Sequence, residues 1–256
     1  MNNIMANKKI MLLLGVLVFA LALLWMAPAT LLAYAIANKT QQHMLLTQAE
    51  GSAWAGNANL VLAGDNVESR VNIGNIRWQV YPMQLLQGRL YLALFQNAGE
   101  PAWLSIDADK THIEHLNITL PASVISLFVP TLNVAQLGGQ FNIATENFTI
   151  SQQVLQGKAS VNWRDASSPL SAVSPLGSYQ TLLDGNGGAL NISLSTMSGA
   201  LQLEGNGSWS AQSGLQFNGT ASAEASKQKE LAPLLHVLGN EQTLGSGRYQ
   251  IQVSQP

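Results

Sequence analysis

The residues best suited to metal or acid–base chemistry lie in one short stretch. They are Asp107, Asp109, His112, Glu114 and His115. Carboxylates and imidazoles are the side chains that ligate zinc and transfer protons. On a helix the two histidines would share a face, but the stretch runs directly into an alternating segment at 116–120. In a strand, positions three apart point to opposite faces, so the spacing favours a polar turn and strand start over a metal site.

Other catalytic signatures are missing from the sequence. It has no Gly-x-Ser-x-Gly elbow and no Walker loop, and the remaining histidines, His43 and His236, are isolated. We therefore expect no catalytic, metal or cofactor-binding residue, and a protein that is not an enzyme.

Composition narrows the function further. The chain has 256 residues, a net charge of −2 and only 10% charged residues. It lacks the concentrated basic face that nucleic-acid binding requires. It also has no cysteine, so no disulfide or thiolate chemistry is available. An exported, disulfide-free domain suits a bacterial periplasm.

An uncharged, strongly apolar run covers residues 10–37. It is long enough for a helix to cross the ~30 Å hydrocarbon core of a bilayer. Lys8 and Lys9 precede it, which favours a cytoplasmic N-terminus. Ala27-Pro28-Ala29 resembles a signal-peptidase site, but residues 31–37 stay apolar beyond it. We expect an uncleaved anchor kinked at Pro28, with a cleaved signal peptide as the alternative.

After the anchor, apolar residues recur with a period of two, which predicts strands with one dry and one wet face. The expected strands are 59–62, 67–73, 76–80, 89–95, 103–107, 116–120, 140–143, 148–150, 159–163, 190–194, 201–203, 215–217 and 249–253. Glycine-rich turn signals lie at 184–188, 205–207 and 218–219. We therefore expect consecutive hairpins in an antiparallel meander, because the segments between the strands are too short for the crossover helices of a parallel sheet.

Two short helices are expected within this pattern. The first is expected at residues 121–128, because Pro121 suits the first position of a helix and Pro130 lies just beyond its end. Residues 227–238 place several leucines on one face before Gly239, and Pro233 predicts a start near Glu230. The predicted fold is mainly β: one transmembrane helix, then an antiparallel meander forming a curved sheet, sandwich or partly open barrel.

Tryptophans Trp78 and Trp163 lie in alternating segments and are expected in the core, whereas for Trp54, among small residues, the core and a turn are equally expected. The domain organisation is a cytoplasmic tail (1–9), a signal-anchor (10–37) and a periplasmic β-rich domain (38–256). A long loop at 164–177 suggests two halves, 44–163 and 178–256.

In its order of motifs the chain resembles the type II secretion system protein N family. The matching pieces are residues 51–56, 76–82, 85–90, 163–166, 175–179, 230–235, 239 and 247–249. One departure is Ser246-Gly247, where the family tends to have Asp-Gly. The motif residues that we expect to be structural are Gly51, Trp54, Gly56, Trp78, Pro82, Gly88, Trp163, Pro175, Gly177, Tyr179, Gly239 and Tyr249.

The resemblance implies an accessory, non-catalytic component that helps to export folded proteins across the outer membrane. It implies partners among the inner-membrane platform proteins of that system, with the secretin as a further candidate, and a location at the bacterial inner membrane. The layout is also similar, more distantly, to AsmA-like envelope proteins, whose curved sheets form an apolar groove. That similarity implies a lipid- or amphiphile-binding role as the alternative function.

Overall fold

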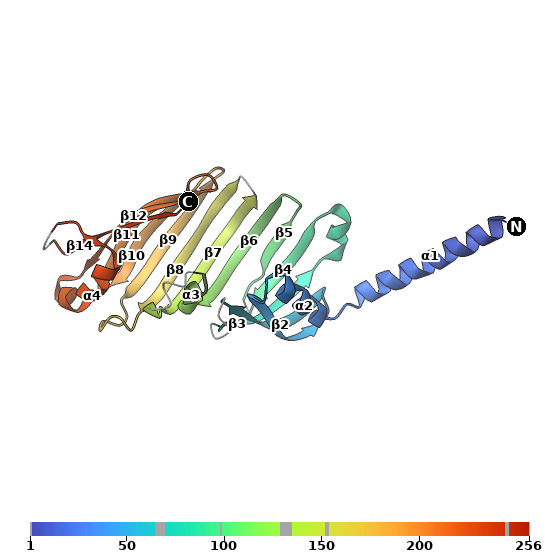
Figure 1. Cartoon of the computed structure of the whole chain (residues 1–256), viewed down its shortest axis with the longest axis horizontal. Coiled ribbons are helices and arrows are strands. Elements are labelled where there is room, and N and C mark those ends of the chain that lie inside the picture. The colour runs from blue at the N-terminus through green and yellow to red at the C-terminus, as the bar shows by residue number, and fades with distance from the viewer. Residues whose placement is uncertain are drawn as a thin grey trace.

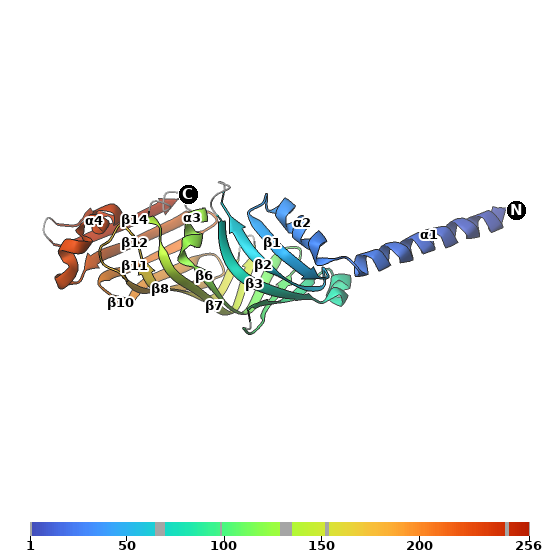
Figure 2. The same cartoon turned by 90° about the horizontal axis from the view of Figure 1, so that it is seen from below.

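The computed structural model describes residues 2–64, 70–97, 99–128, 135–151, 154–243 and 246–255. The main feature is a single, strongly curved antiparallel sheet of 14 strands (Figures 1 and 2). A long helix, α1 (Asn2–Trp25), projects away from one end of the sheet. The predicted mainly β, antiparallel architecture is therefore confirmed, in the form of an open curved sheet.

The strands follow one another along the sheet in chain order, apart from an exchange of the last two. They are β1 (Met44–Gly51), β2 (Ala55–Ala63), β3 (Arg70–Val80), β4 (Leu90–Gln96), β5 (Ala102–Ile106), β6 (Lys110–Pro121), β7 (Gly138–Ser151), β8 (Leu155–Ser167), β9 (Gly177–Asn186), β10 (Leu190–Gly199), β11 (Leu201–Ser210), β12 (Gly214–Ala223), β13 (Asn240–Glu241) and β14 (Arg248–Gln255). Strand β8 pairs directly with β9, so the two halves suggested by the sequence share one continuous sheet.

Several strand and turn predictions were wrong. Strands β1 and β9 were not expected, and the glycines at 205–207 and 218–219 lie inside β11 and β12 rather than in turns. The glycine-rich segment at 184–188 was partly right, because β9 continues to Asn186 before the chain turns. Most of the predicted strand at 67–73 agrees with β3, but its first residues, 67–69, lie outside the described residues.

One face of the sheet is apolar across the strands, as cross-strand pairing shows. From β6 to β9, Ile118 pairs with Ile143, Ile143 with Val161, and Val161 with Thr181. Residues paired in this way point to the same side. Their chain neighbours Asn117, Asn142 and Ser160 therefore lie on the other, polar face.

An irregularity in β6 and β7 keeps this face continuous. His115 has a positive φ of 52°, and β7 holds an extra residue between Thr145 and Phe148 relative to β8. Alternation therefore changes phase at this point, so Ile113 and Phe148 join the same side as Ile118 and Ile143. Without this shift, Ile113 and Phe148 would lie on the polar face.

Helices pack on both ends of the apolar face. Near the start of the sheet lies α2 (Ala29–Lys39), and near its end lies α4 (Gln228–Leu238), preceded by the 3₁₀ turn η4 (Ala225–Lys227). A third helical segment, η2 (Ala122–Val124) with α3 (Ile125–Phe128), follows β6. The two short helices expected at 121–128 and 227–238 correspond to η2 with α3 and to α4. However, α4 starts earlier than expected and contains Pro233 in its interior.

The apolar run at 10–37 is divided between two helices rather than forming one kinked helix. α1 ends at Trp25, and α2 begins after Pro28, which lies in extended conformation. Proline cannot donate the backbone hydrogen bond that a continuing helix needs. Among the described residues, no helix combines the length and the apolar character that crossing a membrane requires.

Candidate functional site

The residues with potential for chemistry have ordinary protein partners. The side chain of Asp107 accepts a 2.8 Å hydrogen bond from Nε of Arg89. His112 lies 2.8 Å from Oγ1 of Thr149 and 3.1 Å from Oε1 of Glu114. Among the described residues, no three histidine or carboxylate side chains gather in a metal-binding group.

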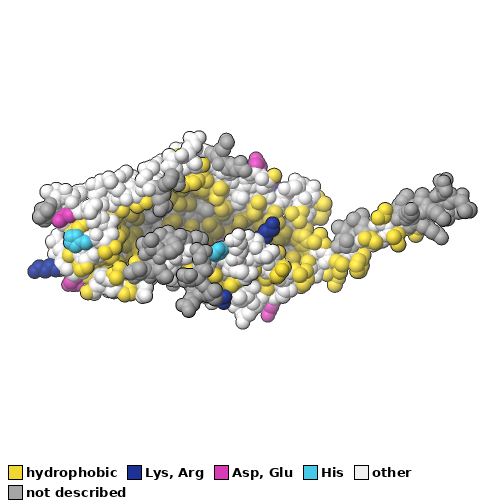
Figure 3. All heavy atoms as spheres, in the orientation of Figure 1, with side chains coloured by type: hydrophobic (Ala, Val, Ile, Leu, Met, Phe, Trp, Pro, Cys, Tyr) yellow, Lys and Arg dark blue, Asp and Glu magenta, His cyan; other side chains and the backbone are white. Residues whose placement is uncertain are grey.

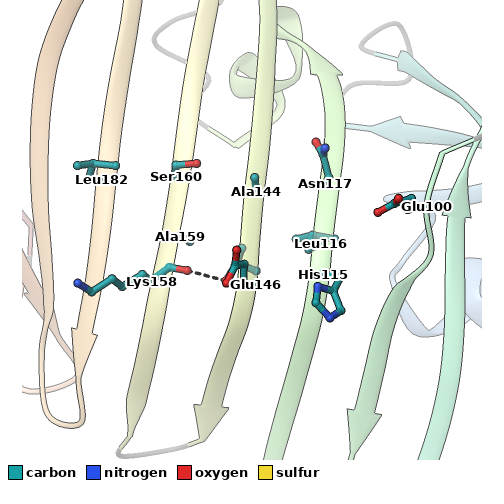
Figure 4. Close-up of a pocket in the computed structure, with 11 residues that line it drawn as sticks. Glu100, His115, Leu116, Asn117, Ala144, Glu146, Lys158, Ala159, Ser160 and Leu182 are labelled. Atoms are coloured by element: carbon teal, nitrogen blue, oxygen red, sulfur yellow. Dashed lines mark hydrogen bonds between the residues drawn. The ribbon is translucent and has the colours of Figure 1, made fainter.

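His115 instead lines a shallow pocket of about 480 Å³ on the polar face (Figure 4). Figure 4 shows Asn117, Ala144, Ser160 and Leu182 in a row across β6 to β9. The hydroxyl of Thr145, which also lines the pocket, donates to the carbonyl of Lys158 at 2.6 Å. The charged groups on the rim are Glu100, Glu146 and Lys158. They are spread over an open surface, so the pocket offers a polar contact area rather than a reaction centre.

The hollow of the sheet is the larger candidate site. Figure 3 shows hydrophobic side chains gathered along it between the two ends of the molecule. We call the apolar face between α2 and α4 the trough. Its side chains are only half-buried, including those of Ile118, Ile143, Val161, Leu183 and Ile192. A closed core would bury aliphatic residues of this size almost completely, so the trough is an incompletely covered apolar surface.

Phe217 in β12 shows how the sequence shapes the trough. Its ring lies over Gly205, Gly207 and Gly219, where β-carbons would come within 2.5, 2.9 and 3.0 Å of ring atoms. Glycine is therefore required at these positions so that the ring can lie against the sheet. This close approach explains why the glycines lie inside strands and not in turns.

The C-terminal end of the trough is closed by a hydrophobic core beneath α4. Leu231, Leu234 and Leu235 of α4 are buried at helical spacing. They share a cluster with buried residues of the loop and sheet, namely Ala166, Leu176, Tyr179, Leu201, Ala221 and Tyr249. Trp163 packs against this cluster, with its ring centroid 5.4 Å from that of Phe141 and 5.6 Å from that of Tyr179.

The polar atoms of the Trp163 and Tyr179 side chains both have hydrogen-bond partners. The indole Nε1 of Trp163 donates to the carbonyl of Gly138 at 3.0 Å, and the hydroxyl of Tyr179 donates to the carbonyl of Leu201 at 3.0 Å. Burial raises the pKa of Tyr179 because the phenolate would lose its hydration. The hydroxyl is therefore a neutral donor under ordinary conditions.

The N-terminal end of the trough is closed by a smaller set, which we call the junction cluster: Trp25, Ala29, Trp54, Gly56, Ala58 and Trp78. Ala29, Ala58 and Trp78 are buried together where α2 meets β2 and β3. Gly56 pairs with Trp78, and a β-carbon there would lie 2.6 Å from the Trp78 ring. Small residues are thus needed for the helix, the sheet and the indole to approach.

Trp54 joins this end of the sheet to α1. Its indole Nε1 donates to the carbonyl of Leu24 at 3.0 Å, and its ring lies 6.3 Å from that of Trp25. The adjacent amide of Ala53 donates to the carbonyl of Ala27 at 2.8 Å. Leu24 lies in the last turn of α1 and Ala27 in the link to α2, so these bonds tie the end of α1 and the link to the sheet. Trp54 lies in the turn between β1 and β2, so of its two expected positions the turn is confirmed.

Most of the twelve motif residues lie at these two ends. Gly51 ends β1 beside Trp54, Pro82 begins the 3₁₀ turn η1 (Pro82–Gln87), and Gly88 ends that turn in the left-handed conformation. Gly177 begins β9 two residues before Tyr179, Pro175 is exposed in the preceding loop, and Gly239 follows α4. The structure therefore groups the motifs around the helical closures of the trough.

A family model matches most of the chain. The model described as type II secretion system (T2SS), protein N, matches residues 42–252. The chain belongs to the type II secretion system protein N family. Comparisons with curated proteins and with solved structures find no match.

Membership in this family gives the chain an accessory role in type II secretion, together with other components of that system. The match begins at residue 42, just before β1, and excludes both α1 and α2. Sequence reasoning missed the contact of Trp25 with Trp54 and the packing of the Phe217 ring against the sheet. For Phe217, the three glycines at alternating positions of neighbouring strands were the available signal.

Proposed function

We propose that this protein is a non-catalytic component of type II secretion, held at the bacterial inner membrane, whose exported sheet docks on other components. The family match over 42–252 is the observation that carries the proposal. The partners would be inner-membrane platform proteins, with the secretin as a second possibility. The polar face supports this role, because across β6 to β8 it carries Asn117, Asn142 and Ser160 at the surface.

The location in this proposal depends on α1 and the start of α2. The side chains of Leu12, Leu14 and Phe19 are exposed on α1, with no charged residue between residues 10 and 37. Exposed apolar side chains along a helix of this kind favour a lipid environment. Ala29 is 1% exposed, and the carbonyl of Ala27 is hydrogen-bonded to Ala53. Both features disfavour cleavage at the Ala27-Pro28-Ala29 pattern after folding.

Site-specific labelling tests the location. The natural chain has no cysteine, so single cysteines report cleanly. Met197→Cys, on exposed β10, should react with a membrane-impermeant maleimide in intact spheroplasts, whereas Asn3→Cys should react only after lysis. Labelling of Asn3→Cys alone before lysis would contradict the proposed orientation.

Photocrosslinking tests the docking role. A photoreactive amino acid at Leu182, exposed on the polar face, should give discrete crosslinks to secretion components. The same group at Ile143, in the trough, is the matched control and should not. Crosslinks only to abundant unrelated envelope proteins would contradict the docking role.

The trough supports a second candidate function, binding of an amphiphile with an acyl chain. Its half-buried aliphatic side chains line a hollow that begins beside the proposed membrane anchor. An acyl chain would remove this surface from water, at about 25 cal/mol for each Å² buried.

Native mass spectrometry of the full chain tests this candidate. We expect a bound amphiphile in the wild-type protein and in Ser160→Glu, which changes the polar face. Val161→Glu, one residue along but facing the trough, should lose it while keeping its circular dichroism spectrum. A wild-type protein that carries no amphiphile would contradict this function.

A further inference from the structure

A second apolar surface lies outside the trough. It consists of the turn η1 and the aromatic group that includes Tyr81, the residue before this turn. Met83, Leu85 and Leu86 of η1 are 71%, 42% and 83% exposed. Tyr81, which directly precedes η1, forms a contiguous aromatic group with Tyr91 and Trp103, with ring centroids 5.5 to 5.9 Å apart. We call these six residues the η1 patch.

The patch is adjacent to the C-terminal end of α1. The amide of Val80, two residues before η1, donates to the carbonyl of Trp54 at 2.6 Å. The indole of the same Trp54 donates to the carbonyl of Leu24. Figures 1 and 2 likewise place β2 and β3 at the end of the sheet from which α1 departs. The turn is therefore held close to the point where the apolar run leaves the domain.

The composition of the patch matches a membrane–water interface. Residues 81–88 contain no charged side chain, and the exposed aliphatic side chains of η1 directly follow the aromatic group that includes Tyr81. Tyrosine and tryptophan favour the headgroup level of a bilayer, where aliphatic residues can enter the acyl boundary. Burial, and the nearby Glu114 carboxylate, raise the pKa of Tyr91, so this ring adds no charge that would oppose lipid contact.

We infer that the η1 patch rests in the interface of the bilayer that the N-terminal apolar run enters. The occupant is lipid rather than protein, because the patch continues the apolar surface formed at the junction by Trp25, Met26, Leu31 and Tyr34. These four side chains are 57 to 77% exposed. The inference rests on the proposed membrane anchoring. It adds a second contact, which would fix the tilt of the sheet relative to the membrane.

Depth-dependent quenching in nanodiscs tests this contact with the full chain. Single cysteines at Leu14, Leu86 and Val237 would carry an environment-sensitive fluorophore, in discs of phosphatidylethanolamine and phosphatidylglycerol with nitroxide-labelled lipid. Val237 is the matched control, since it is 73% exposed but lies on α4 at the far end of the sheet. We expect quenching at Leu14→Cys and Leu86→Cys several-fold above that at Val237→Cys.

The outcomes separate the two ideas. Quenching at 14 without quenching at 86 would overturn the η1 contact and leave the anchor intact. Loss of quenching at both positions would overturn the anchor as well. A label at 86 that becomes shielded only when other secretion components are added would assign the patch to a protein partner and overturn the lipid contact.

Discussion

The two ends of the trough are both closed by a helix, but they differ in the size of the side chains that form the closure. Under α4 the buried set includes Leu231 at 0% and Tyr179 at 2% exposure, with further leucines around them. Under α2 it consists of Ala29, Ala58 and Trp78. Buried area determines hydrophobic stabilisation. The α4 end is therefore the stable core, and the α2 end is a thin closure fitted around one indole.

The largest effect should come from the α4 end. Leu231→Ala removes a fully buried side chain from the cluster, so it should lower the free energy of unfolding by about 2–5 kcal/mol. Val237→Ala, on the exposed side of the same helix, is the control and should change little. Urea denaturation followed by tryptophan fluorescence measures both. Equal effects would show that α4 does not form the core described.

A smaller effect is expected at the α2 end. Gly56→Ala places a β-carbon against the Trp78 ring and the Glu50 carbonyl, and overpacking of this kind costs about 1–3 kcal/mol. Gly188→Ala is the matched control, because nothing lies within 4 Å of its β-carbon position. If Gly56→Ala destabilised the protein more than Leu231→Ala, the α2 end would not be the weaker closure.

Tyr179→Phe tests the hydrogen bond within the α4 end. Loss of the bond to the Leu201 carbonyl should cost about 0.5–1.5 kcal/mol near neutral pH. The raised pKa of Tyr179 keeps the folded phenol neutral, while the unfolded phenol ionises near pH 10. The contribution is complete below about pH 10 and declines as the pH rises above it. The variant should therefore lose less stability than the wild type between pH 9 and pH 11, as chemical denaturation can measure.

The smallest change in global stability is expected for Trp54→Phe. This substitution removes the indole donor to the Leu24 carbonyl but keeps an aromatic ring beside Trp25. The free energy of unfolding should change by less than about 0.5 kcal/mol, while limited proteolysis between α1 and α2 becomes faster. Trp209→Phe, at the other end of the sheet, is the control. An unchanged cleavage rate would show that the indole bond does not hold the junction.

Much of the sheet could be predicted because its physical cause is local. Alternation of apolar and polar residues in strands such as β6 and β10 follows from the side-chain period of two. The two-residue period also predicted that one face would be dry. This period did not predict β9, because Leu182 and Leu183 are adjacent there and a glycine-rich segment follows. It also failed for β1, in which Gln48 has a positive φ.

The glycines of β11 and β12 show a different limit. Asn-Gly pairs favour turns, so the local sequence at Asn218-Gly219 predicts a turn there. The opposing cause is the ring of Phe217, which lies over glycines of its own strand and of the neighbouring one. Likewise Pro233 predicts a helix start, but burial of Leu231 beneath it extends α4 back to Gln228.

By itself, the sequence determined the mainly β class, the antiparallel order, the leucine face of α4 and the apolar N-terminal run, since each depends on residue type and spacing along the chain. Only the tertiary structure decided that the sheet stays open and that its apolar face is half-buried. It also decided that the run at 10–37 divides at Pro28, with its second part packed on the sheet. These features depend on contacts such as Trp54 with Leu24, whose partners are far apart in the chain.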